Sequence, residues 1–330
     1  MARVFIDGFD HGSLGLWDSF AGVTLDQTSK VTGIYSAQMT SGYESVLSKT
    51  ISAISDVYMG LRIYYSAGSA AGVNLVFKDG SGNSQGEIDL LMTEGSFTAT
   101  IANGDGATQD SGVKSHSSGA HTYHVQVHFS NTDNDDKAAT VKLDNIELVT
   151  ASWTNSSPDA TTTEEVEVEF TTGTSAYVDD VVIDNSEWPG APYVYVLQPD
   201  ADGVTNDWSP STGSDNYAVV DEIPASTTDY VETDTDEDVD LYTFENLPDS
   251  DDWTPLSVQV SAYAMTPGPP ANEYLKLAVR VSGTNYYSDS HQLSTGYGHV
   301  SNIWDTNPAS GEWTEFLVNN LEAGVQCEDA

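Results

Sequence analysis

Hydrophobic and polar positions alternate through the first half of the chain, which is the pattern of half-buried β-strands. In residues 56–65 one face carries Val57, Met59, Leu61, Ile63 and Tyr65. Shorter runs predict further strands at 4–9, 73–78, 87–92, 97–102, 123–129, 139–143 and 166–170. Turn-forming clusters such as KDGSGN and ANGDGA separate these runs, and no apolar stripe of helical period interrupts them. The first half is therefore predicted to be all β.

The second half also has a β pattern. Val258, Val260 and Ala262 alternate with polar residues, and a longer alternation spans 275–281. One short helix is predicted at Glu312–Leu321, because Gly324 follows it in a position typical of helix C-caps. We expect an all-β protein made of two β-sandwich (jelly-roll-like) domains in tandem.

The stretch Tyr177–Gly190 marks the predicted domain boundary. It begins as the strand-like run YVDDVVID and ends in Asn, Ser, Pro and Gly residues that interrupt strand pairing, before a new run starts at Tyr193. We predict one domain in 1–188 and a second in 189–330. The linker between them is expected to be exposed and to make few contacts, so that each domain folds alone.

The chain is strongly acidic. It has 51 acidic and 10 basic residues, which give a formal net charge of −41. A nucleic-acid-binding protein needs a basic surface, so that class is excluded, and anionic membrane surfaces are disfavoured for the same reason. No apolar run is long enough for membrane insertion. The charge favours a marine or halophilic setting, or alternatively a soluble surface that resists association.

The cysteine content and the first residues of the chain indicate in which cellular compartment the protein folds. Cys327 is the only cysteine, so no intrachain disulfide is possible. The opening MARVFIDGFD lacks the apolar core of a secretory signal. We expect a protein that folds inside a cell without classical export, and the sequence points to no organic cofactor.

Four segments of the first half resemble the concanavalin A-like (laminin-G-like) jelly roll, over roughly residues 3–186. They are FIDGFD at 5–10, HTYHVQVHF at 121–129, VKLDN at 141–145 and YVDDVVID at 177–184. The resemblance implies that the first and last strands pair. It implies no single function, because such jelly rolls serve as lectins, hydrolases and structural modules alike.

Residues 192–326 resemble a module of structural proteins of tailed viruses that commonly follows a concanavalin A-like domain. The matching segments include YLKLAVRVSGTNYYS and the tail that contains Trp313. The resemblance implies a non-enzymatic virion protein, either a capsid decoration or turret, or a tail fibre or spike. Its implied partners are other capsid or tail proteins, copies of itself as a homo-oligomer, and host-surface glycans. Assembly would take place in the host cytoplasm.

The alternative function is a glycan-binding or glycan-cleaving jelly-roll protein, and one strand carries a motif for it. Retaining jelly-roll glycosidases of the laminarinase type place their acids as E-x-D-x-E or E-x-D-x-x-E. Glu87 and Asp89 match the first two positions, but the third acid is Glu94, at an odd spacing from Glu87. We expect Glu94 on the opposite face or in the following turn, so we favour a solvated strand face over a catalytic one.

Three histidines in or next to the predicted strand 123–129 are the first candidates for a metal site. His124 and His128 share a strand face but lie roughly 13 Å apart along the strand. One zinc ion cannot bridge that distance, because Zn–N bonds are about 2 Å. We therefore interpret these two residues and His121 as polar surface residues.

A second candidate is a calcium site. Asp234, Asp236, Asp238, Asp240 and Glu245 occupy positions 1, 3, 5, 7 and 12 of a calcium-loop pattern. Position 6 should be Gly and is Val239, and the resemblance makes DVDLYTFENL a strand. We favour a solvated strand face here, with calcium as the alternative. Asp179 and Asp180 are a further candidate pair, either a strand end or a cation site.

Overall fold

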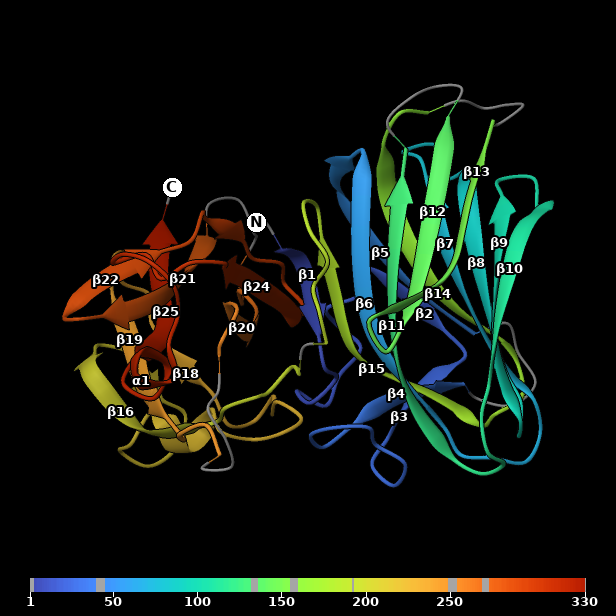
Figure 1. The fold of residues 1–330 in the computed structure, drawn as a ribbon. Helices are drawn as coiled ribbons and strands as arrows, with labels where there is room; N and C mark the ends of the chain where they lie inside the picture. Colours follow the sequence, from blue (N-terminus) through green and yellow to red (C-terminus); the bar gives the residue numbers. More distant parts are fainter. Residues whose placement is uncertain are drawn as a thin grey trace. The chain divides into compact units, whose positions relative to one another are not determined.

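The structure is a computed structural model that describes residues 3–39, 45–131, 136–154, 160–191, 193–248, 254–268 and 273–329. The described residues are almost entirely strands and turns, as the sequence predicts (Figure 1). The chain divides into two compact units, Met1–Tyr195 and Val196–Ala330. This division follows Tyr195, whereas the sequence pattern placed the boundary after residue 188.

The first unit is a sandwich of two antiparallel sheets. Sheet A has eight described strands, in the order β13 (Ile146–Trp153), β12 (Lys137–Leu143), β11 (His121–Ser130), β6 (Asp56–Tyr65), β15 (Ala176–Asp184), β4 (Ser36–Met39) and β3 (Val23–Asp26), with β1 (Arg3–Asp7) on β15. Sheet B has seven, in the order β10 (Thr108–Ser115), β9 (Ser96–Asn103), β8 (Ser84–Met92), β7 (Ala71–Lys78), β14 (Thr163–Thr172), β5 (Ser45–Ile54) and β2 (Ser19–Ala21).

The first and last strands of this unit pair, as the resemblance to the jelly roll implies. In β1 and β15, Arg3 lies opposite Asp184 and Asp7 lies opposite Val181. The VKLDN segment forms β12 and the tight turn into β13, where Asp144 and Asn145 both have positive φ. Asn and Asp tolerate this conformation better than most residues, which explains their place in the hairpin.

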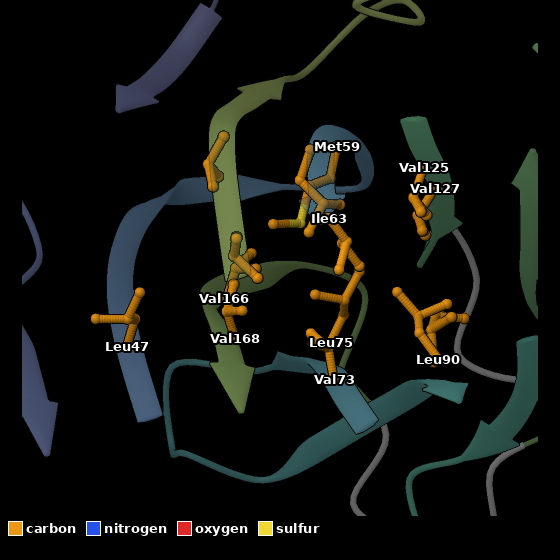
Figure 2. Packing of buried hydrophobic residues seen from close by; sticks show 14 of the residues in the cluster. Leu47, Met59, Ile63, Val73, Leu75, Leu90, Val125, Val127, Val166 and Val168 are labelled. Carbon is orange, nitrogen blue, oxygen red and sulfur yellow. The ribbon is translucent and has the colours of Figure 1, made fainter. Parts of the chain in front are cut away.

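The alternating residues of both sheets meet in one core (Figure 2). Met59 and Ile63 of β6 and Val125 of β11 come from sheet A, while Leu75 of β7 and Val168 of β14 come from sheet B, and all five are fully buried. Burying such side chains stabilises a fold by about 1.5–3 kcal/mol each. The apolar positions that predicted the strands are therefore the positions that form the core.

The second unit is a smaller sandwich. Its main sheet, sheet C, has the order β16 (Pro199–Asn206), β19 (Val239–Phe244), β25 (Glu322–Asp329), β21 (Glu273–Val281) and β22 (Thr284–Tyr287), with β23 (His291–Gln292) on β21. The other described strands form the pairs β17 (Ser209–Pro210) with β18 (Val231–Glu232) and β20 (Val258–Ala264) with β24 (Gly298–Trp304), and the unit also has a 3₁₀ helix, η1 (Tyr217–Val219). Val260 and Trp304 of the β20–β24 pair pack on Leu275 and Leu277 of sheet C.

The predicted helix at Glu312–Leu321 is one turn, α1 (Glu315–Val318). The Thr314 side chain caps it by accepting a hydrogen bond from the Leu317 N–H. Gly324 is not its C-cap. It lies inside β25, where a Cβ atom would stand 1.9 Å from the Asp240 carbonyl oxygen, so the close approach of two strands requires glycine there.

Candidate functional site

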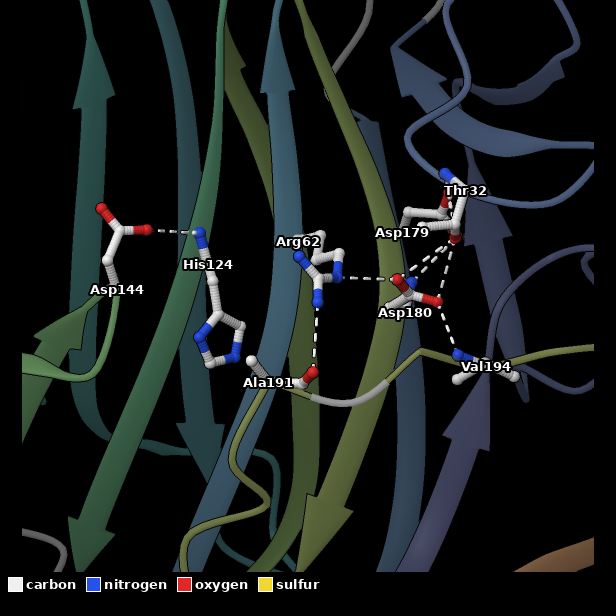
Figure 3. A network of polar contacts seen from close by, with 8 residues as sticks. All are labelled: Thr32, Arg62, His124, Asp144, Asp179, Asp180, Ala191 and Val194. Atoms are coloured by element: carbon white, nitrogen blue, oxygen red, sulfur yellow. Dashed lines mark hydrogen bonds and ion pairs between the residues drawn. The ribbon is translucent and has the colours of Figure 1, made fainter. Parts of the chain in front are cut away.

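A β-bulge in β15 places Asp179 and Asp180, the candidate pair of the first unit, side by side. The register of β15 against β6 shifts between Asp179 and Val182, and Asp180 has a φ of 50°. A bulge re-aims side chains that would otherwise alternate between the faces of the sheet. Both carboxylates therefore face Thr32, whose backbone N–H donates to Asp179 and whose hydroxyl donates to Asp180 (Figure 3).

Arg62 of β6 is the cation that accompanies this pair. Its Nε lies 3.0 Å from Asp180 Oδ2, and the Asp180 carboxylate also accepts a hydrogen bond from the Val194 N–H (Figure 3). Burial raises the pKa of Asp179 to about 8, and the adjacent charge of Asp180 adds to the rise. Burial likewise raises the pKa of Asp180 to about 6, against the opposing effect of the Val194 and Arg62 contacts. Both carboxylates thus have hydrogen-bond or ion-pair partners within the protein.

The segment predicted to be an exposed linker packs on the outer face of sheet A. We call Trp188, Pro189, Gly190, Ala191, Tyr193 and Val194 the strap. The Trp188 ring meets the rings of Tyr58 and His128 edge to face, and Lys142 Nζ lies 3.6 Å above it.

The strap then continues across the sheet through polar contacts. The Gly190 N–H donates to Gln126, the Ala191 carbonyl accepts from Arg62, and the Tyr193 ring lies 4.0 Å from the Arg62 guanidinium. All nine residues of β15 are buried. Its inward-facing apolar residues lie in the core between the sheets, while Asp180 is contacted by Val194 of the strap. The pattern of apolar and turn residues did not predict this packing, because the contacts depend on Arg62, Gln126 and Lys142, which lie one, two and three strands from β15 in sheet A.

The three histidines have separate surroundings. His128 stacks on Tyr58 and contacts the Asp56 carboxylate at 2.9 Å. His124 is buried, and neither of its ring nitrogens has a hydrogen-bond partner among the described residues. Burial and the charge of Arg62 lower its pKa to about 4, so the ring is neutral at physiological pH. His121 contacts the Ser117 carbonyl.

The aspartates of the calcium-loop pattern do not surround one centre. Of the predicted strand DVDLYTFENL, the part Val239–Phe244 does form a strand, β19. Asp240 is buried in it and accepts hydrogen bonds from Asn216 and Tyr242. Asp238 accepts from Thr233 and Asp234 from Thr235, while Asp236 lies in the same turn and Glu245 lies after the strand. In the described parts of the chain, no three His, Cys, Asp or Glu residues have metal-site geometry.

The outer face of sheet B carries a different group of acids, which we call the acidic face: Glu87 and Asp89 of β8, and Glu165, Glu167 and Glu169 of β14. Strand β7 lies between them and contributes Asn74 and Lys78. Asp89 and Glu169 both lie opposite Asn74, one on each side, so these three residues form one row across the sheet. The sequence predicted the β8 acids but gave no sign that β14 would add three more.

Charge is unevenly compensated on the acidic face. Lys78 Nζ pairs with Glu167 at 2.5 Å and approaches Glu165 at 4.0 Å. Among described residues, no ion pair reaches Glu87, Asp89 or Glu169. Glu169 accepts from Asn74 Nδ2 at 2.9 Å, and the buried Asn74 Oδ1 has no partner within the described chain.

The pKa values of the two uncompensated acids on β8 follow from this arrangement. Partial burial raises the pKa of Glu87, and Asp89 and Glu169 raise it further, while hydrogen bonds from Ser84 and Asn74 oppose the rise. Partial burial also raises the pKa of Asp89, followed by the charge of Glu169. The row can accept hydrogen bonds or protons and attracts cations.

The third acid of the glycosidase pattern is not on this face. The position two residues after Asp89 is Leu91, which is 41% exposed. Glu94 lies in the turn after β8, where it accepts a hydrogen bond from the Gly68 N–H. This agrees with the expectation from its odd spacing.

Comparisons with known proteins gave matches among solved structures. No family model and no curated protein matches the sequence. Among solved structures, similar chains include an endo-β-1,4-glucuronan lyase from the fungus Trichoderma reesei, with a TM-score of 0.37, 13% identity, and coverage of 56% of this chain and 96% of that one. A Bacillus licheniformis β-glucanase has a TM-score of 0.35, 12% identity, and coverage of 57% and 100%.

A sialidase is matched at a TM-score of 0.37 and 12% identity over 56% of this chain, which spans 19% of the sialidase chain. At these levels neither an activity nor a substrate carries over to the present protein. In the described residues, no helix is long and apolar enough to span a membrane.

Proposed function

We propose that the first unit is a non-enzymatic glycan-binding module whose ligand lies on the acidic face. The observation that carries the proposal is the row of Asp89, Asn74 and Glu169, with Glu87 beside it. Carboxylates accept hydrogen bonds from sugar hydroxyls, and an amide adds both a donor and an acceptor. Leu91 stands where a retaining glycosidase of the laminarinase type has its third acid, which favours binding over cleavage.

The charge of the acidic face sets the class of glycan. Lys78 is outnumbered by five carboxylates, so uronic acids and sulfated sugars would be repelled. Neutral sugars and amino sugars meet no such barrier. The proposed ligand is therefore a neutral or cationic glycan.

The test compares the full-length protein with a Glu87→Gln, Asp89→Asn double variant, by calorimetric titration of laminaritriose, chitosan trimer and a guluronate trimer. We expect binding of laminaritriose or the chitosan trimer, no binding of guluronate, and at least tenfold weaker binding by the variant. Glu147→Gln is the matched control, because Glu147 is an exposed carboxylate on β13 of sheet A and does not belong to the acidic face. If the wild type instead released new reducing ends from a glycan, and Glu87→Gln abolished that release, the protein would be a glycan-cleaving enzyme.

We also propose that the chain is a structural protein of a tailed virus particle. The resemblance of residues 192–326 to virion modules supports this, together with a net charge of −41. A capsid decoration, turret, fibre or spike would sit on a symmetry axis and form a homo-oligomer with capsid or tail proteins around it. Peptide mass spectrometry of purified particles tests the proposal, and absence of the chain from particles would overturn it.

A further inference from the structure

Two hollows of the second unit meet at one exposed phenylalanine. The first has a volume of about 300 Å³ and is lined by Val204, Arg280, Ser282, Phe316, Asn320 and Glu322, among others. The second, of about 490 Å³, shares Phe316 and Asn320 and adds Asn246, Glu315 and Asn319. Phe316 therefore lines both hollows.

The exposure of Phe316 is not needed to build the core. Its helical neighbours Leu317 and Val318 pack inward with Trp313, and the Thr314 cap fixes the turn. Phe316 is left 73% exposed, the largest fraction among the exposed large hydrophobic side chains of the described chain. Val204, 64% exposed, lines the same hollow. Two exposed apolar side chains thus line one concave surface.

The polar groups of the first hollow are held in place. Arg280 Nη1 donates to Asn285 at 2.8 Å, and Arg280 Nε lies 3.7 Å from Glu322 Oε1. The other oxygen of Glu322 accepts from the Val204 N–H at 2.7 Å, and Asn320 Nδ2 donates to the Phe316 carbonyl. The guanidinium and the carboxylate balance each other, so the hollow carries no net charge although its unit is strongly acidic.

We infer that these hollows bind a neutral sugar, with the ring stacked on Phe316. A sugar ring presents an apolar C–H face, which an exposed aromatic side chain can cover, and hydroxyls at its edge that both donate and accept. Arg280 supplies donors only, Glu322 supplies acceptors only, and the asparagines supply both. The volume of each hollow is in the range of small-molecule sites. This site is independent of the acidic face.

The test is saturation-transfer difference NMR of the full-length protein with four probes: methyl α-D-glucopyranoside, methyl α-D-mannopyranoside, methyl β-D-galactopyranoside and N-acetyl-D-glucosamine. We expect at least one probe to receive saturation, and Phe316→Ala to weaken its binding at least tenfold. Phe316→Trp should retain binding, because it keeps an aromatic face. Phe20→Ala is the matched control, since Phe20 is 53% exposed in the first unit.

Each contrary result overturns the inference. The inference is wrong if none of the four probes receives saturation. It is also wrong if the wild type and Phe316→Ala bind a probe equally well. Loss of binding in the Glu87→Gln, Asp89→Asn variant but not in Phe316→Ala would assign the sugar to the acidic face alone. A change in self-association on Phe316→Ala, with sugar binding absent, would assign Phe316 to a protein contact. Melting temperatures should agree within about 2 °C across the Phe316 variants, because an exposed side chain contributes little to folding.

Discussion

Asp179 and Asp180 make the stability of the first unit depend on pH in a defined direction. The pKa of Asp179 is raised to about 8 in the folded state, well above its ordinary value of 3.8. Between these two values the native state holds a proton that the unfolded chain has released, so the free energy of unfolding falls as pH rises. From pH 6 to pH 9 the loss should be on the order of 2 kcal/mol.

Urea unfolding of the full chain at pH 6, 7, 8 and 9 measures this dependence. Asp179→Asn should be less stable overall, because each Asp179 oxygen accepts a backbone N–H and an amide can accept only through one. Its stability should nevertheless change less with pH than that of the wild type. Equal slopes for the two proteins would show that Asp179 does not hold the proton.

Gly33 is a glycine whose replacement we expect to be costly. Its φ is +49°, and a Cβ atom would stand 1.6 Å from Asp10 Oδ2. Asp10 accepts hydrogen bonds from the N–H groups of Ile34 and Tyr35, so displacing its carboxylate would break both. Gly33→Ala should lower the free energy of unfolding by about 3 kcal/mol.

Gly82→Ala separates backbone strain from this clash. Gly82 also has positive φ, at +81°, but a Cβ atom there would meet nothing within 4 Å. We expect a loss of about 1 kcal/mol, as for an ordinary residue in the left-handed region. If chemical denaturation gave the same loss for both variants, the proposed role of Asp10 in ordering this loop would be wrong.

Among the elements, the strap depends most on a single side chain. Arg62 contacts Asp180, the Ala191 carbonyl and the Tyr193 ring. Arg62→Met keeps much of the side-chain volume but removes these contacts. We expect the amides of Gly190 and Val194 to exchange with deuterium at least tenfold faster, because the strap would then open more often.

Lys114→Met is the matched control for this exchange measurement. Lys114 pairs with Asp144 at 2.8 Å, but both side chains are more than two-fifths exposed and neither touches the strap. Removing such a surface pair changes stability by less than about 1 kcal/mol. Unchanged exchange in Arg62→Met would mean that Trp188 and Pro189 hold the strap without help from the arginine.

Strands that bury one face could be predicted from sequence, and polar strands could not. Residues 56–65 were predicted with the bounds of β6, because alternating apolar side chains follow the pleat. The edge strand β10 was missed, since it is largely exposed and reads TQDSGVKS. Strand β5 was also missed, because SVLSKTISAI mixes small polar and apolar residues without a regular period.

The candidate sites also divide into features that the sequence predicts and features that it does not. The spacing of Glu87 and Asp89 was enough to place both on one face, since they are two residues apart in one strand. That Glu169 and Asn74 would join them depends on strand order, which one sequence does not specify. The hollows at Phe316 were missed for a further reason: a four-residue helix leaves no periodic pattern to show which side chain points outward.

For the whole molecule, the distribution of charge predicts different responses of the two units to salt. Residues 196–330 carry a formal charge of −23 and residues 1–195 carry −18 on a longer chain. Eleven acids and no base fall within residues 229–252, of which 249–252 lie outside the described residues. The Debye length falls from about 8 Å at physiological salt to about 3 Å at 1 M, so added salt screens this repulsion.

We expect the fragment 196–330 to melt at a temperature at least about 5 °C higher in 2 M than in 0.05 M sodium chloride. The shift for the fragment 1–195 should be smaller. Scanning calorimetry of both fragments tests this. Equal shifts would indicate general salting-out, and no shift would indicate that bound cations or a partner already neutralise the acids.

The pairing of β1 with β15 has a consequence for how the first unit can be used. Because these strands are antiparallel neighbours, the chain enters and leaves the jelly roll at one point, with Arg3 opposite Asp184. A domain of this kind can be spliced into a surface loop of another protein with little distortion of either partner. It can also be circularly permuted, for instance by joining its ends and opening the turn at Gly106, where no neighbouring atom lies within 4 Å of a Cβ position. The coding sequence of the first unit could therefore be inserted at different positions in a gene while the encoded domain keeps its fold.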